Sequence, residues 1–485
     1  KILSGWSKTL EPIGSKWPTL LSFENDLKEK VGPLSIQKPL SERLPDIEAY
    51  YDLIADPGQQ IDNRAISAVK KEWSKIGRLN LRGQNRTVEM MKKSTNSGSP
   101  YFTKRKAVVK KTIPTTTEIA EPNVISSLHG DSWFSCAVLG WRGQEGGPTD
   151  MDVKQRVVWM FPFNINIREL QFYQVAIEKA QQYNLVPAWI GMDAVDQTIT
   201  KMFDTKGAQD LVICTDFSKF DQHFNENLQD GAAQIIAHIL NDTYDSKDWL
   251  NTVFPIKYMI PLMYDYGKLK FGKHGMGSGS GGTNFDETLA HRALQYEAAI
   301  HAGTKLNPNS QCLGDDGVLT YPGITVEDVM RAYTSHGLEM NESKQYASTQ
   351  DCVYLRRWHH KDYRLNKICV GVYSTYRALG RLCEQERYYD PEIWSNKMVA
   401  LRQLSIIENC KYHPLFKEFI EYCMKGDKYR LGIDIPGFLD NIESIAQDAI
   451  DIMPDFLGYT KSLEDSDAGY GIANWEVVKY LKSRR

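Results

Sequence analysis

Gln311–Tyr321 reads QCLGDDGVLTY, with two adjacent aspartates flanked by glycines between two short apolar runs. This pattern predicts a tight β-hairpin whose turn carries Asp315 and Asp316. Two carboxylates at one hairpin tip repel each other unless a cation lies between them, and crowded oxygen ligands suit Mg²⁺ or Mn²⁺. Because Asp-Gly is also a common plain turn, this segment alone is open to both interpretations.

A second carboxylate pair lies upstream in Leu211–Phe224, LVICTDFSKFDQHF. Residues 211–214 predict a short buried strand, with Asp216 at its end and Asp221 five residues further on. Asp216, Asp315 and Asp316 together would hold two metal ions about 3.5–4 Å apart, the spacing used for in-line phosphoryl displacement. The alternative for Asp216 is that it caps the next helix.

A glycine-rich run, GMGSGSGGTNFDET, occupies Gly275–Thr288 between these two segments. A flexible linker is the usual interpretation of such a run. This one leads directly into an expected helix over residues 284–299. A glycine loop at the start of a helix lets the backbone approach a nucleic-acid strand closely, with free N–H groups for phosphate or sugar oxygens.

The order D-x4-D, SG-x3-T and GDD resembles motifs A, B and C in the palm of viral RNA-dependent RNA polymerases. The wording DFSKFDQHF, SGSGGTNFDET and GDDG is most similar to the picobirnavirus polymerases. The resemblance implies an α/β (α+β) right hand of fingers, palm and thumb, with a four-stranded antiparallel palm sheet on helices. It divides the chain into an N-terminal segment with fingers (1–203), palm motif A (204–230), a fingers insertion (231–274), palm motifs B to E (275–360), and thumb with C-terminal tail (361–485).

The resemblance also implies roles for residues in the palm. Asp216, Asp315 and Asp316 would be catalytic ligands of two Mg²⁺ or Mn²⁺ ions, and Asp221, Ser278, Gly279, Thr283 and Asn284 would bind the nucleotide and its ribose. Relatives often carry Asn or Asp four residues after the motif B threonine, where this chain has Glu287. Which of Asn284, Asp286 and Glu287 faces the nucleotide is open at this stage.

Four further segments resemble outer motifs of the family. Lys154–Pro162, KQRVVWMFP, would line the nucleotide tunnel, with Lys154 and Arg156 neutralising the triphosphate; an ordinary edge strand is the alternative. Ser97, Gly98 and Pro100 of SGSP would guide the template, unless they form a plain surface turn. Lys344 would act as the general acid for pyrophosphate, or is a solvated surface lysine. Arg356 and Arg357 would contact phosphate of the product strand, although charge pairs on solvated faces are common.

The implied activity is template-directed RNA synthesis from NTPs by two-metal-ion nucleotidyl transfer, for genome replication and transcription. Reverse transcriptases carry a bulky aromatic near the position of Asp221, whereas Asp221 can accept a hydrogen bond from a ribose 2′-hydroxyl. The alternatives are a reverse transcriptase-like DNA-making polymerase and a catalytically inactive RNA-binding protein. Expected partners are the RNA template, the product strand, NTPs and a viral capsid protein, in the virion interior or the host cytoplasm.

Composition fits this interpretation. The 485 residues are 42% hydrophobic and 25% charged, as in soluble globular proteins, and no apolar run reaches the length of a membrane span, so we expect no membrane partner. The eight cysteines include no CxxC pair, which indicates reduced thiols. The net charge of −3 is uneven, with a basic run at 70–111 and an acidic one at 427–467, which would draw RNA into a channel; solvated helix faces would look the same.

Overall fold

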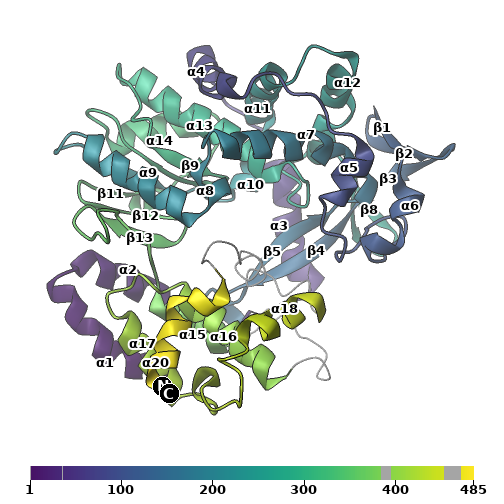
Figure 1. Cartoon of the computed structure of the whole chain (residues 1–485). Coiled ribbons are helices and arrows are strands. Elements are labelled where there is room, and N and C mark those ends of the chain that lie inside the picture. The colour runs from purple at the N-terminus through teal and green to yellow at the C-terminus, as the bar shows by residue number, and fades with distance from the viewer. Residues whose placement is uncertain (1, 35–36, 384–394, 453–470) are drawn as a thin grey trace.

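The computed structural model describes residues 2–34, 37–383, 395–452 and 471–485. In Figure 1 the palm elements lie at the upper left, the fingers strands at the right, and the carboxy-terminal helices at the bottom with the first two helices of the chain. No helix in the described ranges is long and apolar enough to cross a bilayer. Residues 458–471, whose Gly, Ser and Asp content predicts a loop, lie outside the described residues apart from Gly471.

The palm sheet is the predicted four-stranded antiparallel sheet, in the order β11-β6-β10-β9. Its strands are short, and β6 and β10 are central and mostly buried, which explains their nearly continuous apolar sequence. The four strands are β6 Val212–Thr215, β9 Gln311–Leu313, β10 Asp316–Leu319 and β11 Tyr346–Ser348.

Two helices support the palm sheet, as expected, and further helices complete the same core. The long helix α13 (Thr283–His301) contributes Phe285, Leu289 and Leu294 to the largest hydrophobic cluster, which also holds Ile213 and Leu319 of the sheet. Other helices that contribute to this core include α4 Asn63–Trp73, α7 Phe163–Gln182, α11 Glu226–Ile239 and α14 Val326–Thr334.

The fingers strands form two sheets. One is the three-stranded sheet of β1 Thr115–Ala120, β2 Asn123–Leu128 and β3 Asp131–Ser135. The other has the order β5-β4-β7-β8 and is built from β4 Ala137–Gln144, β5 Lys154–Met160, β7 Leu262–Asp265 and β8 Lys268–Lys270. The segment between motifs A and B thus joins the sheet of β5 through β7, which pairs in parallel with β4.

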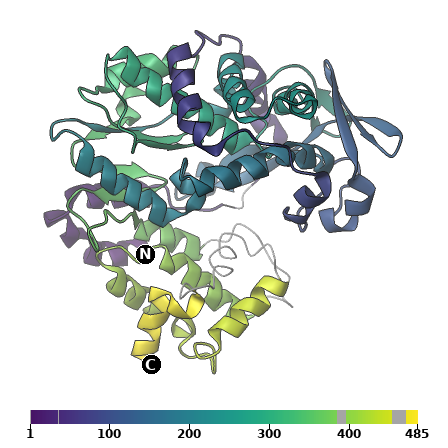
Figure 2. The ribbon, with the colours of Figure 1, turned by 45° about the horizontal axis from the view of Figure 1, so that its top comes forward.

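The carboxy-terminal helices share a hydrophobic cluster with the first two helices of the chain, and both views keep these two groups together (Figure 1, Figure 2). A small sheet of β12 Asp351–Tyr354, β13 Arg357–His360 and β14 Val372–Tyr373 precedes them. The helices of this part are α1 Ile2–Leu10, α2 Pro18–Lys28, α15 Thr375–Cys383, α16 Asn396–Glu408, α17 Phe416–Lys425, α18 Ile442–Ile452 and α20 Glu476–Arg484.

Further helices connect these parts. They are α3 Leu40–Asp52, α5 Gln84–Glu89, α6 Val109–Thr112, α8 Pro187–Ile190, α9 Met192–Thr205, α10 Phe220–His223 and α12 Tyr244–Thr252.

Candidate active site

The predicted hairpin is present, and helix α13 fixes its turn. Asp316 pairs with Leu313, so Gly314 and Asp315 are the two turn residues. Gly314 has a φ of +58°, a left-handed conformation that a residue without a Cβ adopts readily. From α13, Thr288 Oγ1 accepts a hydrogen bond from the Gly314 N–H at 2.9 Å, and the ring Nδ1 of His291 lies 2.8 Å from the Gly314 carbonyl oxygen. Helix α13 therefore holds the hairpin tip through both the N–H and the carbonyl oxygen of Gly314, the first turn residue.

The β6–β10 register brings Asp216 to the same end of the sheet. Thr215, the residue before Asp216, pairs with Gly317, the residue after Asp316. The backbone of Asp216 is fixed by Gln345, whose side chain accepts from the Asp216 N–H and donates to its carbonyl oxygen, each at 2.8 Å. The next helix, α10, has Lys219 at its cap position and no side-chain cap bond, so Asp216 is not a helix cap.

The three aspartates carry raised pKa values. Burial raises the pKa of Asp316 to about 7, and the Asp315 charge adds to the effect, although the Leu355 N–H donates to its carboxylate at 2.8 Å. Burial also raises the pKa of Asp315, together with the charges of Asp221 and Asp216, against the opposing charge of Arg156. For Asp216, burial outweighs the lowering influence of nearby lysines. Each of these three carboxyl groups therefore resists ionisation unless a cation binds beside it.

This donor set fits divalent cations. None of the three aspartates forms an ion pair with a described residue, and their mutual repulsion would be relieved by a cation. Within the described ranges, no group of three or more His, Cys, Asp or Glu side chains is arranged so that it could hold a metal ion by itself, so waters and substrate phosphates would have to complete any ligand set. Mg²⁺ is commonly held by only one or two carboxylates, with waters and substrate phosphates as the other ligands, so an open arrangement of oxygen donors suits it.

Glu287 is the motif B residue that faces Asp221. Its side chain is only 5% exposed, and its Oε2 has no hydrogen-bond partner among the described residues. Burial raises the pKa of Glu287 well above its ordinary value, and the neighbouring Asp221 carboxylate, with which it shares a hydrogen bond, raises it further. The protonated form of Glu287 is therefore favoured beside Asp221, the residue expected to recognise ribose.

The other two open positions have different surroundings. Asp286 is fully buried and accepts hydrogen bonds from Tyr173 at 2.8 Å and Tyr258 at 2.6 Å, with Lys257 Nζ 3.0 Å away. These contacts occupy the Asp286 carboxylate within the core. Asn284 accepts a hydrogen bond from the indole N–H of Trp189 at 2.8 Å. Residue spacing alone could not decide which of Asn284, Asp286 and Glu287 faces the nucleotide, because the answer depends on the rotation of helix α13 against the sheet.

The glycine-rich loop before α13 lies directly on strand β5. A Cβ at Gly279 would lie 1.6 Å from the Trp159 carbonyl oxygen, so only glycine fits this contact. Ser278 Oγ accepts from the Trp159 N–H and donates to the Val157 carbonyl, each at 3.3 Å. Thr283 Oγ1 lies within hydrogen-bond reach of the Gly277 and Ser280 carbonyl oxygens, at 3.2 and 3.3 Å. The loop is a packed element rather than a free linker.

Sequence reasoning missed Glu169, which holds this loop from helix α7. Glu169 is completely buried and accepts hydrogen bonds from Ser280 Oγ and from the Gly281 N–H, the latter at 3.2 Å. Burial raises its pKa to about 7, although the Lys257 charge opposes the rise. The only sequence signal was a glutamate on the otherwise buried face of a long helix, which gives no hint of its partner 111 residues away.

The fingers residues approach the acids from β5 and from an outer turn. Lys154 and Arg156 are exposed on β5, and their charges act on Asp216 and Asp315, respectively. Ser97 is buried, and its carbonyl oxygen accepts from the Phe163 N–H at 2.8 Å.

The turn at 97–100 is also packed tightly against the fingers. Gly98 has a φ of +65°, and a Cβ there would lie 2.9 Å from the Phe161 carbonyl oxygen. Pro100 is exposed at the end of the turn.

Arg356 and Arg357 are not equivalent. Arg356 is exposed at the turn between β12 and β13, and its charge lowers the pKa of Asp316 against the dominant effect of burial. Arg357 is buried, and its guanidinium group binds both carboxylate oxygens of Asp196, at 2.7 and 3.0 Å. The predicted phosphate contact does not fit Arg357, because Asp196 of α9 already engages its guanidinium group. The sequence alone could not show this pairing. Lys344 is exposed, and its charge lowers the pKa of Asp216.

Taken together, an antiparallel palm sheet with acids on a hairpin tip and on the neighbouring strand defines a template-directed polymerase of the right-hand class. Residues 84–422 match the family of viral RNA-dependent RNA polymerases, and the chain belongs to this family. It is therefore an RNA-directed RNA polymerase, and neither the DNA-making nor the inactive alternative is favoured.

Individual relatives show which viral polymerases this chain resembles. The chain is 63% identical over 489 residues to the "Potential RNA-dependent RNA polymerase" of human picobirnavirus (strain Human/Thailand/Hy005102/-), an alignment that covers 100% of this chain and 91% of the relative. A crystal structure of the RNA-dependent RNA polymerase of a human picobirnavirus is 62% identical, with a TM-score of 0.95. An insertion loop deletion mutant of such a polymerase is 60% identical, with a TM-score of 0.93. Each structural match covers 100% of this chain and 91% of the other. The predicted resemblance is confirmed.

Proposed function

We propose that this polymerase joins nucleotides at the cluster of Asp216, Asp315 and Asp316, extending an RNA strand from NTPs as the template directs. The observation that carries the proposal is that three aspartates with raised pKa values lie at the adjoining ends of β6, β9 and β10 without an ion-pair partner among the described residues. Such an arrangement is unfavourable unless the site serves to bind cations.

The same three carboxylates would hold Mg²⁺ or Mn²⁺. When bound, two such ions supply charge neutralisation for the transferring phosphate and the leaving pyrophosphate. The protein's own contribution is then to position the reactants, because phosphoryl transfer leaves little covalent chemistry to side chains. The hydrogen bonds from Thr288 and the contact with His291 serve this purpose by fixing the hairpin tip.

Other residues receive roles around the nucleotide. Lys154 and Arg156 bind the triphosphate from β5, which their influence on the pKa of the aspartates supports. Asp221 accepts a hydrogen bond from the ribose 2′-hydroxyl, with Glu287 beside it as donor to Asp221. Lys344 donates a proton to the leaving pyrophosphate, a role that the influence of its charge on the pKa of Asp216 supports.

The loops surrounding this centre contact RNA. Ser278, Gly279, Thr283 and Asn284 present the glycine-rich loop and the start of α13 to the nucleotide. The turn at Ser97, Gly98 and Pro100 guides the template, and Arg356 contacts the product strand. The exposure of Pro100 and Arg356 supports these two contacts.

We also infer that the protein acts inside the virion or in the host cytoplasm, in contact with a capsid protein and without a membrane. Membership in a family of viral polymerases supports this setting. Fractionation of purified particles tests it: the chain should co-sediment with capsid protein at a fixed ratio and should not float with added lipid vesicles.

The test of the active site compares Asp315→Asn with the wild type on a short RNA template, with Mg²⁺ or Mn²⁺ and labelled NTPs or dNTPs in parallel. We expect incorporation of NTPs by the wild type and a loss of about 100-fold or more in the variant, with RNA binding retained. Asp131→Asn, an exposed aspartate of β3, is the matched control and should keep full activity. Normal synthesis by Asp315→Asn would reject the assignment of the site.

A further inference from the structure

A cavity lies beside β9, the edge strand of the palm sheet. Its volume is about 210 Å³. Its walls come from the end of α4, the residues between α7 and α8, helix α9, helix α13 and the loop that leads into β9. Because β9 has no neighbour on this side, side chains from both faces of the strand, Gln311 and Cys312, reach the cavity. Of the residues that line the cavity, only Thr288 received a role above, in holding the hairpin tip.

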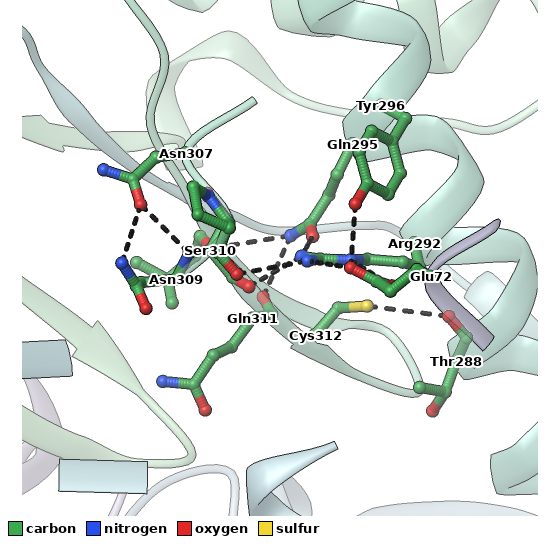
Figure 3. A network of polar contacts seen from close by, with 12 residues as sticks. Glu72, Thr288, Arg292, Gln295, Tyr296, Asn307, Asn309, Ser310, Gln311 and Cys312 are labelled. Atoms are coloured by element: carbon green, nitrogen blue, oxygen red, sulfur yellow. Dashed lines mark hydrogen bonds and ion pairs between the residues drawn. The ribbon is translucent and has the colours of Figure 1, made fainter. Parts of the chain in front are cut away.

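One wall of the cavity is rigid (Figure 3). The Arg292 guanidinium group donates to both carboxylate oxygens of Glu72, at 2.7 and 3.1 Å, and to the Ser310 carbonyl oxygen at 2.6 Å. Tyr296 donates its hydroxyl to the same Glu72 carboxylate at 2.8 Å. These bonds tie α4, α13 and the loop before β9 together. The cavity is therefore part of the fold and needs no rearrangement to exist.

Gln311 carries a buried acceptor that the described residues leave unpaired. The residue is 3% exposed, and its Nε2 donates to the Val195 carbonyl oxygen of α9 at 3.3 Å. That bond sets the orientation of the amide, and no described donor reaches the Oε1 atom. In Figure 3 the amide points away from Arg292 and Glu72. A buried amide oxygen is normally hydrogen-bonded, so this atom marks where a ligand donor belongs.

The mouth of the cavity is positively charged. Lys75 and Lys201 line it, both are exposed, and neither ammonium group forms an ion pair or hydrogen bond with a described residue. Glu72 is the only acidic residue among the lining residues, and Arg292 already neutralises it. Tyr183, which is 43% exposed, adds an aromatic ring at the same cavity. These groups would together recognise a ligand that carries an anionic group, an aromatic ring and a hydrogen-bond donor.

We propose that this cavity is a second nucleotide site, which binds a mononucleotide with its phosphate at Lys75 and Lys201 and a base N–H at Gln311 Oε1. The site communicates with the catalytic hairpin. Thr288 lines the cavity and also accepts the Gly314 N–H, and Cys312 precedes the turn by two residues. A bound nucleotide restrains the wall that holds the hairpin, so occupancy regulates polymerisation. Binding at the cavity does not depend on the residue roles proposed for the active site, whereas its regulatory effect rests on the proposed catalytic role of the hairpin.

Calorimetric titration of the full chain with AMP and GMP, without template or metal, tests the proposal. We expect saturable binding that Lys201→Glu weakens by about tenfold or more, because charge reversal at the mouth repels phosphate. Lys305→Glu, an exposed lysine of the adjacent loop that does not line the cavity, should bind as the wild type does. Asp315→Asn should also bind normally, which separates this site from the catalytic one.

Three results would overturn the proposal. The first is no saturable binding of either nucleotide. The second is binding that Asp315→Asn removes and Lys201→Glu leaves intact, which would place the nucleotide at the active site. The third is inorganic phosphate that binds as tightly as AMP, which would reduce the cavity to an anion site without recognition of the base. Photolabelling with 8-azido-AMP provides an independent check, since the label should map to peptides containing Tyr183 or Lys201.

Discussion

At the scale of single residues, the discrimination between ribose and deoxyribose proposed for Asp221 would depend on a carboxyl pair rather than on one aspartate. Glu287 is held protonated by burial and by the Asp221 charge, so it can donate a hydrogen bond to Asp221. That bond would fix the Asp221 carboxylate while leaving an oxygen free for the 2′-hydroxyl. A donor at this position would suit this arrangement, and an amide side chain would supply one as well.

Substitutions of Glu287 test this pairing. Glu287→Gln keeps a donor of the same size, and we expect its preference for NTPs over dNTPs to stay within about twofold of the wild type. Glu287→Ala removes the donor, and the preference should fall by about tenfold, the worth of one hydrogen bond to a charged group. Steady-state incorporation of ATP and dATP on the same template measures both. Equal discrimination in wild type and Glu287→Ala would contradict the role of the pair.

The sequence predicted the acids at this scale and could not predict their partners. Asp216, Asp315 and Asp316 are recognisable because each sits in a short motif whose local pattern carries its own structural meaning. The role of Glu287 depends on the rotation of α13, and the pairing of Arg357 depends on Asp196 in a helix 161 residues away. Contacts of that kind are set by tertiary packing, which no local spacing encodes.

At the scale of elements, the glycine-rich loop is positioned between strand β5 and helix α7. The strand fixes it through Ser278, and the helix fixes it through Glu169. Loops of this composition are normally mobile, so the two supports make the backbone available for nucleotide without the entropy of a free linker.

Removal of the helical support tests its contribution. Glu169→Ala leaves Ser280 and the Gly281 N–H without their acceptor, so the loop should lose its fixed position. We expect kcat for incorporation to fall by about 10- to 100-fold, as small misplacements of reacting groups do, with affinity for the RNA duplex unchanged. Lys179→Ala, exposed on the same helix, is the control and should retain kcat. A loss of RNA affinity equal to the loss of kcat would indicate general damage rather than loop misplacement.

A second element-scale prediction concerns pH and the last helix. Glu408 at the end of α16 accepts the N–H groups of Glu476 and Val477 at the start of α20, each at 3.0 Å. Burial nevertheless raises its pKa from 4.5 to about 7. Between these two values the folded state binds more protons than the unfolded state, so the contribution of Glu408 to stability falls as pH rises.

We therefore expect Glu408→Gln to reduce the decline in the unfolding temperature between about pH 4.5 and pH 7. Thermal unfolding at a series of pH values, with Glu418→Gln as a control on α17, measures this. The difference between Glu408→Gln and the wild type should be largest at the upper end of the window. A pH profile identical to that of the wild type would show that Glu408 does not titrate in this range.

At the scale of the whole molecule, the first two helices of the chain pack against its carboxy-terminal helices. Helices α1 and α2 pack in the hydrophobic cluster of the carboxy-terminal helices, with Trp6, Leu10 and Leu20 fully buried there. The mixture of Pro, Gly and charged residues at 1–59 predicts an extended segment, and this prediction was wrong, because helices α1 and α2 form there with their apolar faces covered by the carboxy-terminal helices. The sequence could not predict which distant segment covers which face, because many apolar stripes are interchangeable in sequence and only one arrangement satisfies the polar contacts between them.

One buried carboxylate carries the polar contacts that join the two ends. Glu24 of α2 is fully buried and accepts hydrogen bonds from the hydroxyl groups of Ser374 and Thr375 and from the Thr375 N–H, the last at 3.1 Å, at the start of α15. His413 Nε2 lies 3.0 Å from the same carboxylate. Burial opposes ionisation of Glu24, yet the hydrogen bonds and charge of these partners hold its pKa below the ordinary value.

Loss of this carboxylate should loosen the joint between the two ends while leaving the palm folded. Glu24→Ala leaves a buried histidine and the start of α15 without their acceptor, a defect that costs about 3–5 kcal/mol in comparable buried pairs. Glu29→Ala, exposed at the end of the same helix, removes a carboxylate without such contacts and should be neutral. Amide hydrogen exchange read segment by segment distinguishes the outcomes, because a single unfolding temperature mixes several regions in a chain of this size. Faster exchange in α1, α2 and α15, with unchanged protection in α13 and the palm strands, is the expected result. Amide protection in Glu24→Ala that equals the wild type in every segment would mean that apolar packing alone joins the two ends. Faster exchange throughout the palm would mean that the two regions fold as one cooperative unit.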